Sequence, residues 1–276
     1  MRKAMPVLFC LLYVLFLFNA CKTIEHSTKE VQTVQNFPFD HKKFQHHFEL
    51  ASWLYTYDRL VNFAHHRLQA QSSNSNLAPQ NWLCYQNTEG KWFAIYRDLS
   101  QVPFETLAHY QFIKNSIDTA DMVAPAQLEA YSSALAQTLL VSDSISKVTK
   151  TALNTYVETS SSNSSIRTWV LPAYEQNKLS TFGGEFAYTY DEKGEQLIRS
   201  SNNFDGFKHL ELGILNELIL DYKKYNTPTI GSLFYVACFA KSYESITIKT
   251  AQVASTMQWR DKENRKQMYW QHTLDF

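Results

Sequence analysis

The chain of 276 residues has few glycines, prolines and cysteines and no net charge. Seven glycines and seven prolines exclude a collagen-like or low-complexity chain, and four cysteines exclude a disulfide-dense miniprotein. The 26 basic and 26 acidic side chains balance, so no basic excess is present to neutralise phosphates, and we expect no nucleic-acid partner. A hydrophobic content of 45% excludes a wholly disordered chain and is sufficient for a folded core.

Local motifs for metal binding and catalysis are missing as well. The nine histidines show no HxH, HxxxH or HExxH spacing, which would direct two imidazoles toward one zinc ion. Neither a G-x-S-x-G nucleophile motif nor a G-x-x-x-x-G-K-S/T phosphate loop occurs. We therefore expect no metal site and no cofactor, and no local pattern predicts a catalytic residue. A catalytic site assembled from distant positions leaves no such pattern and stays open.

A long apolar run stands at the N-terminus. Val7 to Phe18 are twelve consecutive apolar residues behind the basic pair Arg2 and Lys3. As a helix they would span about 18 Å, which is too short for a hydrocarbon core of roughly 30 Å. This length and the preceding charges are typical of an export signal, and we predict a signal peptide at residues 1–20.

The end of the run carries a more specific pattern. Ala20 stands directly before Cys21, and this step resembles the lipobox of bacterial lipoproteins. Phe18 and Asn19 depart from the usual leucine and small residue, as in the looser lipoboxes of Bacteroidota-type bacteria. The resemblance implies that the signal is removed and that Cys21 is acylated, for example with palmitate, at the new N-terminus. A plain secretory signal and an uncleaved anchor are the alternatives.

Acylation would fix the location of the protein. Several acyl chains, at about 0.8 kcal/mol per buried CH2, hold a protein on a membrane essentially permanently. We therefore expect a lipid-anchored protein of the bacterial cell envelope, on the outer membrane, with the periplasmic or surface side left open. Residues 21–40 lack apolar periodicity and are rich in Thr, Gln and Lys, which predicts a flexible tether to the folded part.

Two cysteines, Cys84 and Cys238, would remain beyond the tether. Each lies in an apolar run typical of a strand, NWLCYQ and LFYVACF respectively. In an oxidising compartment they can pair as a disulfide, which would stabilise the fold by up to about 5 kcal/mol in the chain-entropy model. The alternative is two buried thiols in separate strands that behave as small apolar residues.

Residues 41–276 show the patterns of a single α+β domain, because helices and antiparallel hairpins come in runs instead of alternating. Apolar residues at helical spacing predict a long N-terminal helix from His41 to about Gln71, capped by Asp40 and packed between two surfaces. Two Asx-x-x-Gly turns, at Gly90 and Gly194, predict hairpins. Helical spacing also predicts helices over residues 126–158, with a break at 141–144, and over 208–225. Further strands are expected at residues 106–113, 166–171, 233–240, 244–250, 253–259 and 267–272.

The most unusual local stretch runs from Trp169 to Phe186 and contains the only glycine pair. Glycines can admit a ligand or another backbone segment closely, and the alternative is a simple bend before a strand. The residues that we take as the candidate ligand region are Trp169, Gly183, Gly184, Glu185, His209 and Glu211.

The leading hypothesis is a binding or interaction module for a small ligand or an unknown envelope protein. It rests on the predicted anchor together with the missing catalytic spacings. One alternative is an envelope hydrolase whose site is assembled around Glu185, His209 and Glu211, because acid pairs and triads come together from distant positions. The other alternative is a structural subunit of the envelope.

Overall fold

The computed structural model describes residues 39–72, 77–114, 116–120, 124–159, 164–173, 175–176, 179–211, 216–262 and 265–274. All of them belong to one compact unit, Pro38–Phe276. The predicted signal peptide, the predicted acylation site Cys21 and nearly all of the predicted tether lie outside the described residues. None of the helices within the described ranges is long and apolar enough to span a membrane.

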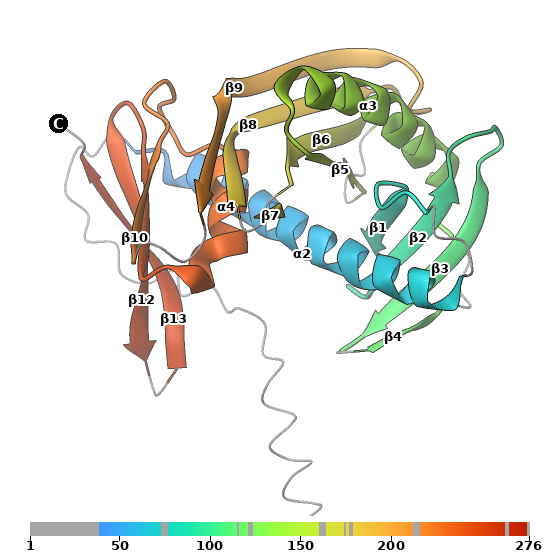
Figure 1. The fold of residues 1–276 in the computed structure, drawn as a ribbon, viewed down its shortest axis with the longest axis horizontal. Helices are drawn as coiled ribbons and strands as arrows, with labels where there is room; N and C mark the ends of the chain where they lie inside the picture. The colour runs from blue at the N-terminus through green and yellow to red at the C-terminus, as the bar shows by residue number, and fades with distance from the viewer. Residues whose placement is uncertain are drawn as a thin grey trace, which may run out of the picture. The chain divides into compact units, whose positions relative to one another are not determined.

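The described strands form three sheets (Figure 1). The first is β1 (Trp82–Gln86), β2 (Trp92–Asp98), β3 (Glu105–Ile113) and β4 (Ser116–Thr119), in this spatial order. The second has the order β5-β6-β8-β7, with β9 paired to β8, and comprises β5 (Leu153–Glu158), β6 (Ile166–Pro172), β7 (Glu175–Gln176), β8 (Leu179–Tyr190) and β9 (Leu197–Glu211). The third is β10 (Glu217–Asp221), β11 (Ser245–Lys249), β12 (Val253–Lys262) and β13 (Arg265–Leu274).

The helices are α2 (His41–Gln71), α3 (Leu128–Thr149) and α4 (Ile230–Phe239), followed by the 3-10 turn η1 (Ala240–Ser242). Strand pairs within these sheets are antiparallel apart from β10 and β11, which run parallel. The fold is therefore mixed α+β and contains more strand than helix, which confirms the predicted class at this coarse level.

Both predicted hairpins are present. Gly90 and Gly194 have positive φ angles of 75° and 73°, and each donates its N–H to the Asx carbonyl that opens the turn. These hydrogen bonds are 2.9 Å to Asn87 and 3.0 Å to Asp191. The turns join β1 to β2 and β8 to β9. Their residues therefore set where each of these two strand pairs begins.

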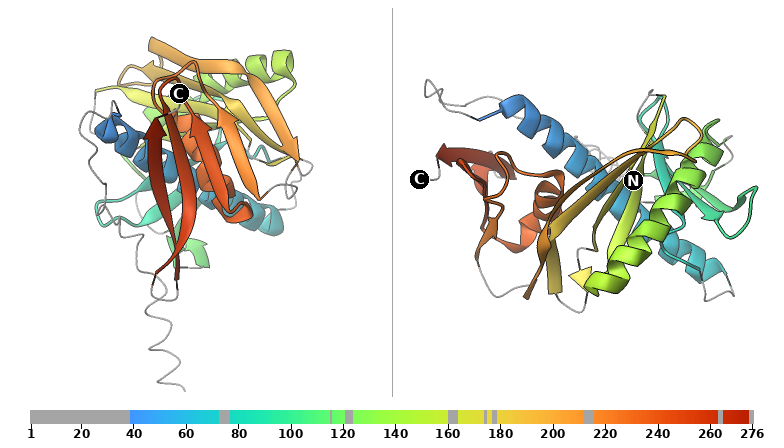
Figure 2. Two further views of the ribbon diagram at one scale, coloured as in Figure 1. Left: turned by 90° about the vertical axis from the view of Figure 1, so that its left-hand side faces the viewer. Right: turned by 90° about the horizontal axis from the view of Figure 1, so that it is seen from above.

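Helix α2 occupies the predicted range, and its first turn is capped by Asp40, whose side chain accepts the N–H of Lys43 at 2.9 Å. The helix contacts α4, the first sheet and β5. The Tyr57 hydroxyl donates to the Trp82 carbonyl on β1 at 3.0 Å. Near the N-terminus of α2, Phe44 packs edge-on against Trp270 of β13, with ring centroids 5.2 Å apart. Figure 2 shows α2 running from the third sheet to the first.

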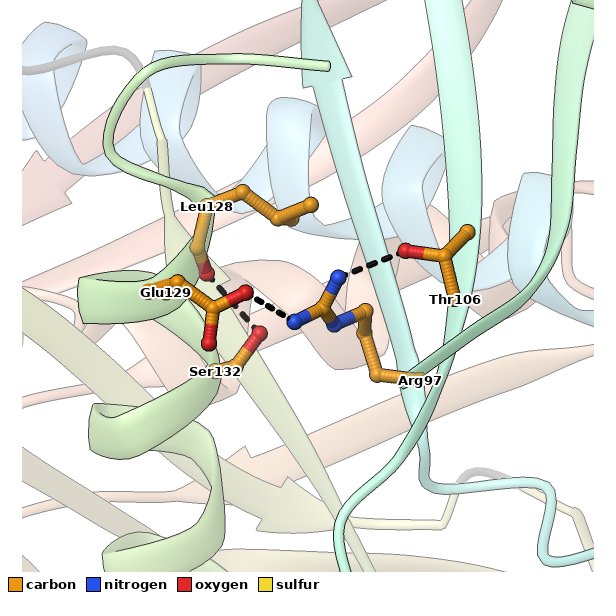
Figure 3. Close-up of polar contacts among 5 residues, drawn as sticks. All are labelled: Arg97, Thr106, Leu128, Glu129 and Ser132. Atoms are coloured by element: carbon orange, nitrogen blue, oxygen red, sulfur yellow. Dashed lines mark hydrogen bonds and ion pairs between the residues drawn. The ribbon is translucent and has the colours of Figure 1, made fainter. Parts of the chain in front are cut away.

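Helix α3 contacts β5 and β6, and its apolar side chains share one core cluster with residues of the first and second sheets. A buried cation fixes its N-terminus (Figure 3). Arg97 of β2, with a side chain 4% exposed, donates to the Glu129 carboxylate in the first turn of α3 and to Thr106 Oγ1 at 2.5 Å. Because Glu129 is 60% exposed, water screens the pair, and its main effect is to position α3.

A buried polar network joins α2 to β5. Asp58 is 3% exposed. Its Oδ1 accepts hydrogen bonds from Asn154 at 3.0 Å and from the Tyr156 hydroxyl at 2.9 Å, and its Oδ2 accepts one from Asn62 at 3.0 Å. Burial raises the pKa of the Asp58 carboxyl to about 6, although the three hydrogen bonds oppose the rise.

The predicted helix over residues 126–158 is too long. Helix α3 ends at Thr149, Lys150 adopts a φ of 55°, and Leu153–Glu158 form β5. In β5, Leu153, Thr155 and Val157 are buried on one face and Tyr156 on the other, so the strand is covered on both sides. The predicted break at residues 141–144 is absent, and Ser144 Oγ donates to the Leu140 carbonyl at 2.9 Å within the continuous helix.

Two other segments have the opposite type from the prediction. The described residues of the predicted helix over 208–225 are not helical, because β9 continues to Glu211 and Glu217–Asp221 form β10, with Leu218 and Leu220 buried in alternation. Residues 233–240 do not form a strand. They lie in α4 and η1, and Thr229 starts α4 by accepting the Ser232 N–H at 3.1 Å. Most residues of α4 are buried, so its apolar run lacks the helical period that would distinguish it from a strand.

Of the two alternatives for Cys84 and Cys238, the structure shows free thiols and no disulfide between them. Cys84 is buried on β1, whereas Cys238 is half-buried on α4 and not on a strand. Burial raises the pKa of both thiols well above the ordinary value, so both behave as small apolar side chains.

The substitution Asp58→Asn is expected to change how stability depends on pH. The pKa of Asp58 is about 6 in the folded protein and 3.8 in an exposed reference, so folding favours the protonated acid. This contribution is fully present below pH 3.8 and is lost as pH rises through about 6, up to roughly 3 kcal/mol. Urea denaturation from pH 4 to pH 7 should show the wild type losing this much stability relative to Asp58→Asn. A difference that stays constant with pH would contradict the assignment.

Candidate functional site

The predicted ligand region is spread over three strands of the second sheet. Trp169 lies on β6, Gly183 to Glu185 lie on β8, and His209 and Glu211 lie on β9. Trp169 is 5% exposed, and its indole N–H donates to Glu158 Oε2 at 3.2 Å. This tryptophan is therefore part of the core and does not offer its ring to a ligand.

The glycine pair admits close contacts within the protein. Gly183 has a φ of 101°, and a Cβ added there would lie 2.3 Å from the Gly206 carbonyl oxygen. A Cβ added at Gly184 would lie 2.3 Å from the Phe207 ring. The register of β8 against β9 shifts at this point, between Phe182 and Gly184. The glycines thus allow β9 and its phenylalanine to approach β8, which favours the bend over the ligand.

Glu185 caps a helix. It is 6% exposed, accepts the Gly231 N–H of α4 on Oε2 at 2.5 Å and accepts Asn203 Nδ2 on Oε1 at 2.8 Å. Burial raises its pKa, and the hydrogen bonds, Gly231 first, oppose the rise. A carboxylate at this place pairs with the partial positive charge and the unpaired N–H groups of the N-terminus of α4. Both of its oxygens are therefore occupied by the protein itself.

The residues of the hydrolase alternative are not brought together. His209 is exposed and its Nδ1 lies 2.9 Å from Thr181 Oγ1, directly across the β8–β9 ladder. Glu185 lies four positions further along β8, which corresponds to about 13 Å of strand. Glu211 is exposed opposite Leu179 at the far end of β9. Over the described ranges, no three His, Cys, Asp or Glu side chains are grouped as metal ligands.

An open hollow of about 440 Å³ lies beside the third sheet. This volume falls in the range of ordinary small-molecule sites, about 300–1,000 Å³. The hollow is formed by the segments around η1, the start of β10 and the hairpin of β12 and β13. Its lining residues are Asn216, Lys241, Ser242, Tyr243, Glu244, Trp259 and Lys266.

Trp259 is the rigid part of this hollow. Its indole N–H donates to the Ala240 carbonyl at 2.9 Å and to the Tyr243 carbonyl at 3.2 Å. The two bonds fix the ring orientation and join β12 to the turn after α4. A ligand in the hollow would meet an indole that is already oriented, so little conformational entropy would be lost there on binding.

The polar groups of the hollow are of mixed charge. Lys241 and Lys266 are exposed and make no ion pair within the described part of the chain. Glu244 also lines the hollow, and Asp261 stands opposite Lys266 in the β12–β13 ladder. The lining itself holds two lysines and one carboxylate, a small excess of positive charge, together with the neutral donors and acceptors of Asn216 and Ser242.

The sequence-based prediction missed this hollow. Its residues come from four separated places in the chain, and neither their spacing nor their types form a local motif. The available signal was Trp259, at the end of a predicted strand and followed by several basic residues. The same pattern fits a tryptophan of the core.

The variant Glu185→Ala is expected to destabilise the fold by about 2–3 kcal/mol, because the Gly231 N–H and the Asn203 amide lose a charged acceptor. Glu185→Gln should cost less, since glutamine keeps one acceptor and Asn203 can reverse its amide. The exposed control Glu211→Ala should stay within about 0.5 kcal/mol of the wild type. Urea denaturation measures the change, and hydrogen exchange at Gly231 locates it. Wild-type stability of Glu185→Ala would show that the carboxylate does not cap α4.

No family model, no curated protein and no solved structure is significantly similar to the chain. The description of the fold and of the hollow beside Trp259 therefore depends on the residues of this chain alone.

Proposed function

We propose that the protein is a lipid-anchored binding protein of the bacterial cell envelope, on the outer membrane, and that its ligand occupies the hollow beside Trp259. The anchor is supported by the apolar run at residues 7–18 and by the lipobox-like step from Ala20 to Cys21. Neither feature depends on the fold of residues 41–276, so anchor and ligand site can be tested separately.

The binding role rests on one observation, the oriented indole of Trp259 in an open hollow whose lysines make no ion pair with the described residues. Since the indole N–H is already satisfied, the ring and the ammonium groups are available to a second molecule as far as the described part of the chain is concerned. Aromatic rings with polar side chains around them are the usual composition of small-molecule sites. Nothing in the hollow requires bond cleavage, and binding is the simplest use of these groups.

The chemistry of the hollow fits a polyhydroxylated ring, such as one unit of a saccharide. The apolar face of such a ring packs on an indole, while Asn216, Ser242 and the lysines donate to its hydroxyl oxygens. Glu244 can accept hydrogen bonds from the same hydroxyls. Because the lining holds two lysines and one carboxylate, its positive excess is small, and an anionic ring suits the hollow as well as a neutral one.

The variant Cys21→Ser is expected to abolish labelling of the protein by radioactive palmitate in the bacterial cell, because the acyl acceptor is the Cys21 sulfur. Cys10→Ser is the matched control, since Cys10 lies inside the apolar run that is removed, and it should label like the wild type. Fatty acid on Cys21→Ser would overturn the predicted anchor and leave the hollow untouched.

The hollow is tested with a panel of neutral and acidic disaccharides and saturation-transfer NMR on the full chain in detergent. We expect millimolar binding of at least one neutral disaccharide, weakened by about threefold or more in Lys241→Ala and in Lys266→Ala, because each loses a charged donor. Lys91→Ala, in the hairpin turn of the first sheet, is the control. Equal binding by all variants would place the ligand elsewhere, and binding lost at 0.5 M salt would indicate an ionic ligand.

A further inference from the structure

The chain enters α2 through a pair of phenylalanines. Phe39 stands directly before the N-cap residue Asp40, and Phe44 is the fourth residue of the helix. Their rings pack with centroids 5.5 Å apart, and both side chains are buried. This arrangement is a hydrophobic staple, which fixes the direction in which a chain enters a helix. The staple therefore holds the end of the predicted tether against the start of the domain.

A histidine from the other end of the chain packs against this staple. The ring of His272, on β13, stacks on Phe39 at a centroid distance of 4.0 Å and meets Phe44 nearly edge-on at 4.6 Å. Trp270, two residues earlier on the same strand, also packs edge-on against Phe44. These contacts join the start of the domain to its last strand. We name the set of rings the aromatic clasp; it consists of Phe39, His41, Phe44, Trp270 and His272.

Around His272, the described part of the third sheet offers neutral neighbours. Its Nδ1 lies 2.9 Å from Oγ of Ser255, the residue opposite it on β12, and Ile248 stands opposite Ser255 on β11. Ser255 and Ile248 are fully buried. From α2, the ring of His41 faces that of His272, with centroids 5.6 Å apart and planes at 76°. The other charged side chains at this end of α2 are exposed, namely Asp40, Lys42 and Lys43.

We propose that the aromatic clasp is a pH-sensitive latch, in which acid charges the His272 ring and the first turn of α2 then separates from β13. The closed clasp accommodates a charged imidazole poorly. Two phenylalanine rings replace water around it, and within the described residues no carboxylate pairs with it. A positive charge on His41, which faces the ring, adds like-charge repulsion. Separation returns His272 to water and frees Phe39 at the end of the predicted tether.

The direction of the effect follows from the titration of His272. Burial, and after it His41, lower the pKa of His272 from 6.5 to about 4. The closed clasp therefore favours the neutral ring, and its stabilisation is complete above pH 6.5 and is lost as the pH falls toward 4. From pH 7 to pH 5 the equilibrium for closing should fall on the order of 20-fold. The Phe39 ring acts in the opposite direction, because the face of an aromatic ring attracts a cation.

The latch is independent of the proposed anchor and of the proposed ligand site. On the β12–β13 hairpin, the hollow uses Trp259 and Lys266, which lie toward the turn, whereas His272 lies toward the open end. Failure of acylation or of saccharide binding would leave the latch unaffected, and a clasp that ignores pH would leave both of those proposals unaffected.

Histidine-labelled NMR on the full chain in detergent micelles measures the titration of His272 directly. The expected midpoint lies clearly below 6.5, because the closed clasp resists the charge. The variant His41→Gln removes the facing positive charge and should move the midpoint upward, toward 6.5. A wild-type midpoint at 6.5 or above would mean that the attraction of the Phe39 ring for a cation prevails, and it would overturn the proposal.

Hydrogen exchange measures the opening itself. The Phe44 N–H donates to the Asp40 carbonyl at 2.9 Å, and its protection, corrected for the intrinsic pH dependence of exchange, should fall on the order of 20-fold from pH 7 to pH 5. The Tyr131 N–H in the first turn of α3 is the internal reference and should not lose protection.

Two variants assign the opening to the charge on His272. His272→Phe keeps a ring in the clasp that cannot be charged, so the fall in protection at Phe44 should disappear. His66→Gln, on an exposed position of α2, is the matched control and should show the fall of the wild type. If His272→Phe does not fold, His41→Gln should still reduce the fall, because it removes the repulsion. Constant protection in the wild type, or an equal fall in both clasp variants, would overturn the proposal.

Discussion

The packing of α2 is the constraint on which the rest of the structure depends. This helix contacts the first sheet, β5 of the second sheet and α4, and its first turns reach Trp270 of the third sheet. Each sheet therefore buries part of its apolar face against the same helix. One side of the helix stays exposed, at His46, Glu49 and Arg67 among others, and the polar groups that it carries inward on the other sides must be satisfied by its neighbours. Asp58 is such a group, and its three side-chain donors come from α2 and β5.

The same requirement explains why buried charged groups in this protein are poor guides to function. Asp58 and Glu185 both have pKa values raised by burial, which in an unknown protein is a reason to suspect an active site. In both, however, the carboxylate oxygens accept hydrogen bonds from elements that they hold in place. Arg97 repeats the pattern with the opposite sign at the start of α3. The hollow beside Trp259 differs because its lysines are exposed and make no ion pair within the described part of the chain, and for that reason we propose the ligand site there.

How far each structural feature could be predicted from the sequence depends on how local its signal is. Asp40, Gly90 and Gly194 act through hydrogen bonds within a few residues, and the helix cap and both hairpins lie where these residues predict them. The segment Leu153–Glu158 was predicted as helix because its apolar residues fit both periods, and pairing with β6 decided for a strand. The apolar run of α4 has no period. Glu185, which caps the N-terminus of this helix, lies 46 positions before Gly231 in the sequence. The hollow depends entirely on such distant positions, and its chemistry becomes visible only when η1 meets β12.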